Sequence, residues 1–109
     1  MDTDQVRIVF SVEPDHCVLR LAGVLGVSNA EELRQTALQI CAYRRDVTVD
    51  WSGAAQIDAA IAQVLLALRA DLAEQNRSLG HCEKIPPPIQ NWFNTAGLSE
   101  VFGKAGLGA

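Results

Sequence analysis

The stretch that decides the fold runs from Asp46 to Gln75 and reads DVTVDWSGAAQIDAAIAQVLLALRADLAEQ. Its first six residues, 46–51, are rich in β-branched side chains, which favours a short central strand. Residues 52–56 are small and polar and are predicted as a loop, and Asp58 is predicted to cap a long helix that ends near Gln75. Between residues 59 and 68 only Gln63 is polar, which predicts that the helix is buried on every side.

Upstream of this stretch the pattern predicts a hairpin and a helix. Apolar residues alternate over 6–12 and again over 17–21, with Pro14-Asp15 between them, which is typical of two antiparallel strands joined by a turn. Residues 28–31 (SNAE) fit a capping box with Ser28 as the cap. The helix is expected to end near Tyr43, with Arg44 and Arg45 at its C-terminal carbonyls.

Downstream of it, residues 78–83 indicate a weaker strand and 89–96 a short helix. Gly97 fits a left-handed helix end, with Leu98 returning to Phe93. The glycine-rich residues 103–109 are expected to be frayed. The order β-β-α-β-α-β-α predicts an α/β fold, with a mixed four- to five-stranded sheet, an antiparallel first strand and helices packed against it. All of 1–109 is expected to form a single domain with its core over about 6–102.

Composition excludes several classes of function. The chain has 109 residues, 49% of them hydrophobic and 20% charged, with a net charge of −4. This is ordinary globular usage, and its sign disfavours nucleic acid and anionic membranes as partners. The longest apolar run, 64–68, is far short of the roughly 18 residues that span a bilayer, so no membrane insertion is expected. The acidic start, 1–5, lacks signal-peptide features, and a cytoplasmic protein is expected.

No reactive constellation stands out. The three cysteines, Cys17, Cys41 and Cys82, are expected to be free thiols. The dipeptides His16-Cys17 and His81-Cys82 place neighbouring side chains on opposite faces of a strand, so no metal site is expected. The 23–26 segment lacks the spacing of a phosphate loop and is predicted as a strand–helix connection with a positive φ. Neither a catalytic set nor a cofactor site is indicated.

Several short motifs, taken together, resemble the STAS domain family of anti-sigma factor antagonists and their relatives. A strand ending in D-x-S-G and followed by I-D matches Asp50, Ser52, Gly53, Ile57 and Asp58. Residues 19–25 are similar to the family's L-x-L-x-G-x-L, residues 30–34 to its first helix, and residues 93–102 to its closing G-L-x-x-x-F. The resemblance covers about 6–102 and implies a single STAS-like domain.

The resemblance also implies a function, and one departure modifies it. In many members, a serine or threonine after the aspartate is phosphorylated by a partner kinase. Here Ala59 and Ala60 follow Asp58, and Ile61 replaces the family glycine. Alanine cannot form a phosphoester, so no phosphorylation is expected at Ala59. A phosphate there would carry about two negative charges onto a helix N-terminus.

We therefore expect a non-enzymatic module that docks to a regulatory protein, such as an anti-sigma kinase or a chemotaxis or transporter component. The candidate partner-binding residues lie around the predicted loop and the first turns of the helix: Asp50, Ser52, Gln56, Asp58, Ala59, Ala60 and Gln63. The same residues also fit a plain structural role, with Asp58 as a helix cap and the alanines as ordinary packing.

The sequence is also compatible with other classes of function. The chain fits an accessory subunit that steadies a chemotaxis or lipid-transport ABC assembly. Nucleotide binding rests only on the crevice of an α/β sheet and a helix N-terminus. A homodimer through the edge of the first strand is compatible with the sequence, as is a monomer whose edge is protected by Arg7 and Glu13.

Overall fold

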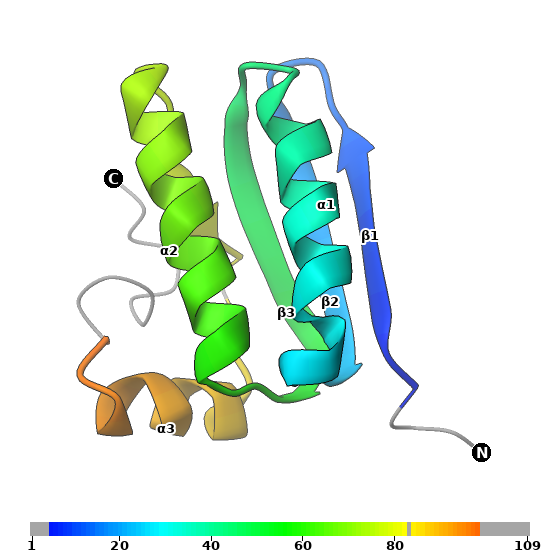
Figure 1. Ribbon diagram of the computed structural model, residues 1–109, viewed down its shortest axis with the longest axis vertical. Coiled ribbons are helices and arrows are strands. Elements are labelled where there is room, and N and C mark those ends of the chain that lie inside the picture. The colour runs from blue at the N-terminus through cyan, green and yellow to red at the C-terminus, as the bar shows by residue number, and fades with distance from the viewer. Residues whose placement is uncertain (1–4, 83, 99–109) are drawn as a thin grey trace.

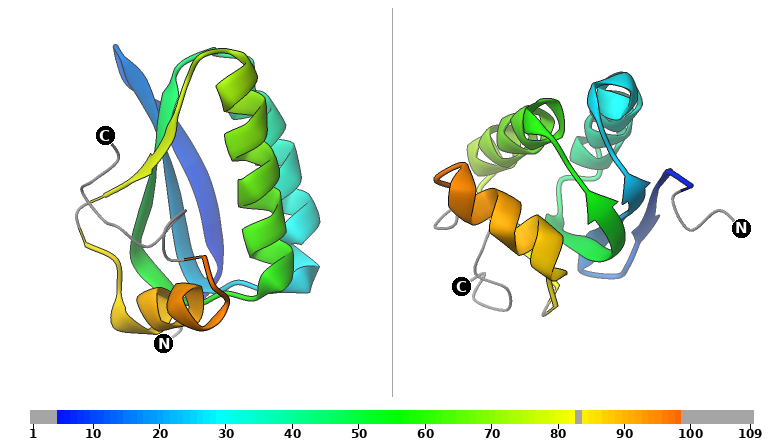
Figure 2. Two further views of the ribbon diagram at one scale, coloured as in Figure 1. Left: turned by 90° about the vertical axis from the view of Figure 1, so that its left-hand side faces the viewer. Right: turned by 90° about the horizontal axis from the view of Figure 1, so that it is seen from below.

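A computed structural model, which describes residues 5–82 and 84–98, shows a four-stranded sheet in the order β1-β2-β3-β4. The described elements are β1 (Arg7–Val12), β2 (His16–Val24), a 3₁₀ turn (Val27–Asn29), α1 (Ala30–Cys41), β3 (Asp46–Gln56), α2 (Ala59–Glu74), β4 (Leu79–His81) and α3 (Pro87–Thr95). Helices α1 and α2 lie side by side on one face of the sheet, and α3 closes one end (Figures 1 and 2). The predicted α/β fold is confirmed. The tail 103–109, Glu83 and the end of the closing motif at Phe102 lie outside the described residues.

Strands β1 and β2 form the predicted antiparallel hairpin, in continuous register from Arg7 opposite Ala22 to Val12 opposite Cys17. Strand β2 is parallel to β3, and β3 is parallel to β4. On β1, Ile8 is buried as predicted, but Val12 is 39% exposed, because it ends a strand at the edge of the sheet. The predicted role of Arg45 at the end of α1 is wrong: its guanidinium donates instead to the backbone carbonyl of Glu13 in the hairpin turn.

The predicted loop at 52–56 is wrong, because β3 continues to Gln56. Two register shifts against β2 lie in this stretch, one between Arg20 and Ala22 and one between Gly23 and Val24. Each shift inserts an extra β3 residue, as a β-bulge does. Trp51, Ala54 and Ile57 are therefore buried at a spacing of three, which hides the period-two pattern of a strand.

Close contact between the two strands explains the glycine in this stretch. A Cβ at Gly53 would lie 2.9 Å from the Cβ of Ala22, closer than two carbon atoms pack. On β2, Gly23 has a φ of 87°, so the predicted positive φ is confirmed. It lies inside the strand, which runs one residue further than predicted, to Val24.

Helix α1 begins differently from the prediction. Ser28 is exposed and lies within the 3₁₀ turn, so it does not cap the helix. Instead the side-chain oxygen of Asn29 accepts a hydrogen bond of 2.9 Å from the N–H of Gly26. The capping box is therefore wrong, because the 3₁₀ turn moves the first α-helical residue to Ala30.

Helix α2 is capped as predicted but is not buried on every side. The residues facing the core are Ile61, Ala62, Leu65, Leu68 and Leu72. Ala59, Gln63 and Ala67 are exposed. The sheet and α1 cover only part of the helix surface, so the prediction of all-round burial is wrong. The first half of α2 presents uncharged side chains outwards.

Aromatic packing joins β3 to α3. Trp51 and Phe93 are fully buried, and their rings meet edge to face with centroids 5.6 Å apart. Helix α3 ends as predicted at Gly97, with a φ of 77°. The N–H of Leu98 bonds to the carbonyl of Phe93 at 2.8 Å, which completes a Schellman motif.

Candidate docking site at the start of helix α2

The carboxyl ends of β2 and β3 meet where α1 and α2 begin. The N–H of Leu25 donates to the carbonyl of Gln56 at 2.9 Å, just after the ends of β2 and β3 and before α1 and α2 begin. The backbone at Gly26 approaches α2 so closely that a Cβ there would lie 3.3 Å from Oδ2 of Asp58. In α/β sheets, binding sites gather at this edge.

Asp58 fixes the first turn of α2. Its Oδ1 accepts hydrogen bonds from the backbone N–H groups of Ala60 at 3.1 Å and Ile61 at 3.3 Å. The carboxylate thus satisfies two of the helix's free donors and stabilises the positive end of its dipole. Ala59, the first helical residue, is exposed. The first turn therefore offers a rigid backbone with methyl groups and no charge beyond the cap itself.

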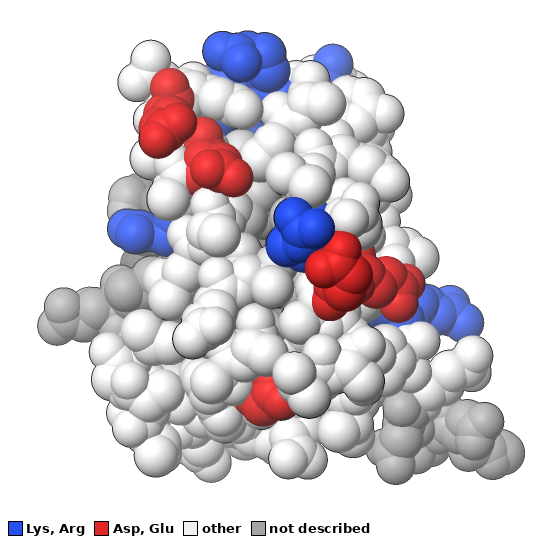
Figure 3. Space-filling model, viewed as in Figure 1, with Lys and Arg blue, Asp and Glu red and all other residues white. Residues whose placement is uncertain are grey.

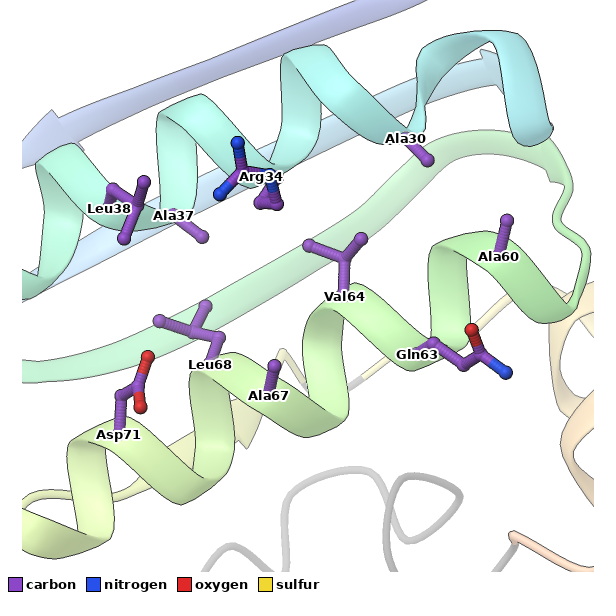
Figure 4. A pocket seen from close by; sticks show the side chains of 10 residues that line it. All are labelled: Ala30, Arg34, Ala37, Leu38, Ala60, Gln63, Val64, Ala67, Leu68 and Asp71. Atoms are coloured by element: carbon purple, nitrogen blue, oxygen red, sulfur yellow. The ribbon is translucent and has the colours of Figure 1, made fainter.

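A groove of about 290 Å³ runs along α2 from this turn. Figure 4 shows side chains of α1 and α2 facing each other across it. Its lining is mostly alanine and aliphatic: Ala30, Arg34, Ala37, Leu38, Ala60, Gln63, Val64, Ala67, Leu68 and Asp71. Leu38 is 50% exposed, and Figure 3 shows that charged side chains on this face lie mainly away from the start of α2. The groove therefore continues the mostly apolar surface of the first turn, with Arg34 and Asp71 as its charged lining residues.

Arg34 contributes little free charge to the groove. Its guanidinium donates to both carboxylate oxygens of Glu31, at 3.2 and 3.0 Å. These hydrogen bonds lower the pKa of the exposed Glu31 carboxyl. Arg34 is therefore paired with a residue of its own helix. The other polar side chains along the groove are Gln63 and Asp71.

The predicted site residues fall into two groups. Gln56, Asp58, Ala59, Ala60 and Gln63 lie together at the end of β3 and on the first turns of α2. The second group, Asp50 and Ser52, belongs to the opposite face of the sheet, because these residues alternate with buried neighbours on β3.

On that open face, the carboxylate of Asp50 contacts the backbone of Ser52 and the guanidinium of Arg20. Its Oδ1 accepts a hydrogen bond of 2.9 Å from the N–H of Ser52, and its Oδ2 lies 3.7 Å from Nε of Arg20 on β2. Arg20 in turn donates to the hydroxyl of Ser11 at 3.1 Å. A shallow hollow of about 200 Å³ lies on this face, and its lining includes Asp50, Ser52, Arg20, Arg7, Ala22 and Gly53.

Most of the groove was not predicted from the sequence. Ala60 and Gln63 were predicted as site residues, whereas the α1 residues opposite them were not. The signal was present in the helical spacing, since residues 30, 34 and 37 on one helix and 60, 64, 67 and 71 on the other each follow one face. Which faces meet depends on how the helices pack, and the sequence does not supply that.

The described residues hold no metal-binding group of three or more His, Cys, Asp or Glu side chains. All three cysteines are free thiols, as predicted, with Cys17 buried and the other two half-buried. Burial raises the pKa of Cys17, Cys41 and Cys82. A raised pKa keeps a thiol protonated and a poor nucleophile.

The sequence of this chain matches the model of one known protein family over most of its length. The family model described as Mlab, STAS domain matches residues 8–105. Among curated proteins no sequence matches. Within residues 5–82 and 84–98 no helix has both the length and the apolar character needed to cross a bilayer.

Solved structures share the fold at low identity. An anti-sigma factor antagonist from Mycobacterium paratuberculosis aligns with a TM-score of 0.79 at 16% identity, covering 94% of this chain and 87% of its own. The Bacillus cell fate determinant SpoIIAA in its phosphorylated form aligns with a TM-score of 0.66 at 16% identity, covering 94% and 93%. The murine anion transporter Slc26a9 aligns with a TM-score of 0.68 at 16% identity, covering 84% of this chain but 15% of the transporter. Since the family match spans nearly the whole chain, this protein belongs to the STAS domain family, in its Mlab branch.

Proposed function

We propose that this chain is a non-enzymatic, cytoplasmic STAS domain, comprising residues 1–109, that works by docking to a regulatory protein in the manner of anti-sigma factor antagonists. The docking surface is the end of β3 and the first turns of α2, at Gln56, Asp58, Ala59, Ala60 and Gln63, extended by the groove between α1 and α2. The observation that carries the proposal is the exposed, uncharged first turn of α2, which Asp58 holds rigid. Rigid small side chains let a partner's backbone approach without a loss of side-chain entropy.

The alanines make this docking independent of phosphorylation at the usual place. Ala59 and Ala60 carry no hydroxyl, so a kinase has no acceptor on the first turn. The partner then regulates the complex through its own availability. Incubation with the partner kinase and ATP, followed by mass spectrometry, is expected to yield no phosphopeptide between Trp51 and Leu66. A phosphate mapped to this stretch contradicts the proposal.

The docking surface is tested by matched substitutions on one helix. The partner is first identified by affinity capture from the source cell and then purified, and its dissociation constant is measured by calorimetry. Ala59→Tyr is expected to weaken binding at least about tenfold, because a bulky ring holds the two surfaces apart. Ala73→Tyr, at an exposed alanine near the other end of α2, is the control and is expected to bind as the parent does. Equal binding by both variants moves the interface elsewhere.

Asp50 and Ser52 enter the proposal as a second contact, on the open face. Ser52→Tyr tests it separately, since Ser52 is exposed there and its side chain lies beside Asp50 and Gly53. Weaker binding by Ser52→Tyr and by Ala59→Tyr means that the partner reaches around the end of the sheet. An effect of Ala59→Tyr alone confines the interface to the helix face.

A second candidate is an accessory subunit of a chemotaxis or lipid-transport ABC assembly, a role that membership of the STAS domain family also allows. The two candidates use the same docking surface and differ in the partner. Capture of an anti-sigma kinase supports the first, whereas capture of a transporter ATPase or a chemoreceptor component supports the second. The neighbouring genes give an independent answer.

A further inference from the structure

Strand β1 is an edge strand whose outer side is available to another strand. It pairs only with β2 in the described sheet. The N–H of Glu13 donates to the carbonyl of His16 at 2.7 Å, and hydrogen-bonded pairs alternate along an antiparallel ladder. The odd-numbered residues of β1 therefore bond to β2. Ile8, Phe10 and Val12 direct their N–H and C=O groups outwards, away from the sheet.

Apolar side chains surround this outer edge. Val9 is 44% exposed on the open face, and Val12 is 39% exposed on the helix face. Tyr43, at 47% exposure, meets Phe10 edge to face with ring centroids 6.0 Å apart. An unpaired edge flanked by exposed valine and tyrosine is a surface that favours strand addition.

The charges at the two ends of β1 complement each other in one arrangement. When two copies of the strand run antiparallel with Phe10 opposite Phe10, Arg7 of each copy lies opposite Glu13 of the other. Residues 8 and 12 then face each other with their outward backbone groups in phase for hydrogen bonding. Arg7 and Glu13 form non-hydrogen-bonded pairs, in which side chains are closest, with about 4.5 Å between Cα atoms.

Other registers lose this match. A shift of two residues places Glu13 opposite Val9 or Gln5, and a shift of one residue pairs outward backbone groups with inward ones. Pro14 has no N–H and ends the ladder beyond Glu13. Ser11 donates to the Glu13 carboxylate at 3.1 Å, which holds that side chain on the same face of the sheet as Arg7.

We propose that a second copy of this chain pairs with β1 in this register, joining two four-stranded sheets into one continuous sheet across a two-fold axis at Phe10. The dimer then holds two charge pairs, because each copy contributes its Arg7 to one pair and its Glu13 to the other. The interface lies on β1 and does not include the first turn of α2, so the inference is independent of the docking proposal.

Charge reversal tests the register. Sedimentation equilibrium of the full chain over a concentration series is expected to show a reversible dimer. Arg7→Glu and Glu13→Arg each place like charges opposite one another and are expected to weaken dimerisation about tenfold or more. The double variant restores opposite charges and is expected to recover dimerisation. Circular dichroism of each variant checks that the monomer remains folded.

A parent protein that stays monomeric up to high concentration overturns the proposal, and Arg7 and Glu13 then protect the edge instead. A dimer that tolerates both single reversals overturns the register and the β1 interface. Recovery of dimerisation in the double variant supports the arrangement. The two charge reversals compensate for each other only if residue 7 of one copy lies opposite residue 13 of the other. Phe10→Pro, which removes an outward N–H but no bond to β2, is expected to abolish the dimer.

Discussion

The indole Nε1 of Trp51 donates a hydrogen bond of 3.0 Å to Nδ1 of His81. The two rings stack at 26°, with centroids 6.3 Å apart, and both contact the ring of Phe93 on α3. Trp51 lies at the first register shift of β3, between Asp50 and Gly53. One polar contact inside an aromatic cluster thus ties β3, β4 and α3 together at the strand that leads into α2.

Trp51→Phe tests this cluster. The change removes the hydrogen-bond donor and leaves unfilled volume beside Phe93. We expect the free energy of unfolding to fall by about 1–3 kcal/mol, as measured by urea denaturation. Trp92, which is half-buried, remains as the fluorescent probe. Trp92→Phe is the control and is expected to lose less, because its ring is not enclosed. Equal losses in the two variants contradict the assignment.

The bulged stretch of β3 depends on the missing side chain at Gly53. Gly53→Ala places a Cβ 2.9 Å from that of Ala22, and such overpacking is expected to cost about 1–3 kcal/mol of stability. Adding Ala22→Gly opens the same space, so the double variant is expected to be more stable than the sum of the single changes. Gly80→Ala, where no atom lies within 4 Å, serves as the control. Strict additivity in thermal unfolding refutes the contact.

The cap at Asp58 supports the first turn of α2. Asp58→Ala leaves the N–H groups of Ala60 and Ile61 without this acceptor, and we expect a loss of about 1 kcal/mol in chemical denaturation. Asp58→Asn keeps an oxygen acceptor and is expected to lose less. Asp71→Ala, at an exposed carboxylate on the same helix, is expected to change stability by less than about 0.5 kcal/mol. A matching loss at both positions contradicts the assignment of the effect to capping.

The pair of Glu31 and Arg34 has a measurable pH signature. Hydrogen bonds from Arg34 and Gln35 lower the pKa of Glu31. A carboxyl whose pKa is lower in the folded state contributes stability above its unfolded pKa, and that contribution is lost as the pH falls through the folded pKa. In an NMR titration, Arg34→Gln is expected to raise the midpoint of Glu31 towards its ordinary value. An unchanged midpoint excludes the pairing in solution.

Local sequence patterns were sufficient to predict those features whose geometry depends only on residues close together in the chain. Alternation along 6–12 and 17–21 identified the hairpin, Asp58 identified the start of α2, and Gly97 identified the end of α3. In each case the signal is a short-range one: a period, a side-chain acceptor for free N–H groups, or a residue that adopts a positive φ.

Tertiary structure decided the rest, because burial and register belong to pairs of elements. The strand at 52–56 could not be recognised from the sequence, because its two bulges are defined only by its pairing with β2. Which side of α2 stays exposed to solvent depends on where α1 lies. The sequence of an apolar helix does not indicate whether one layer or two layers of other elements cover it. For the same reason, the sequence grouped Asp50 and Ser52 with Ala59 and Ala60, whereas the sheet itself lies between the two groups.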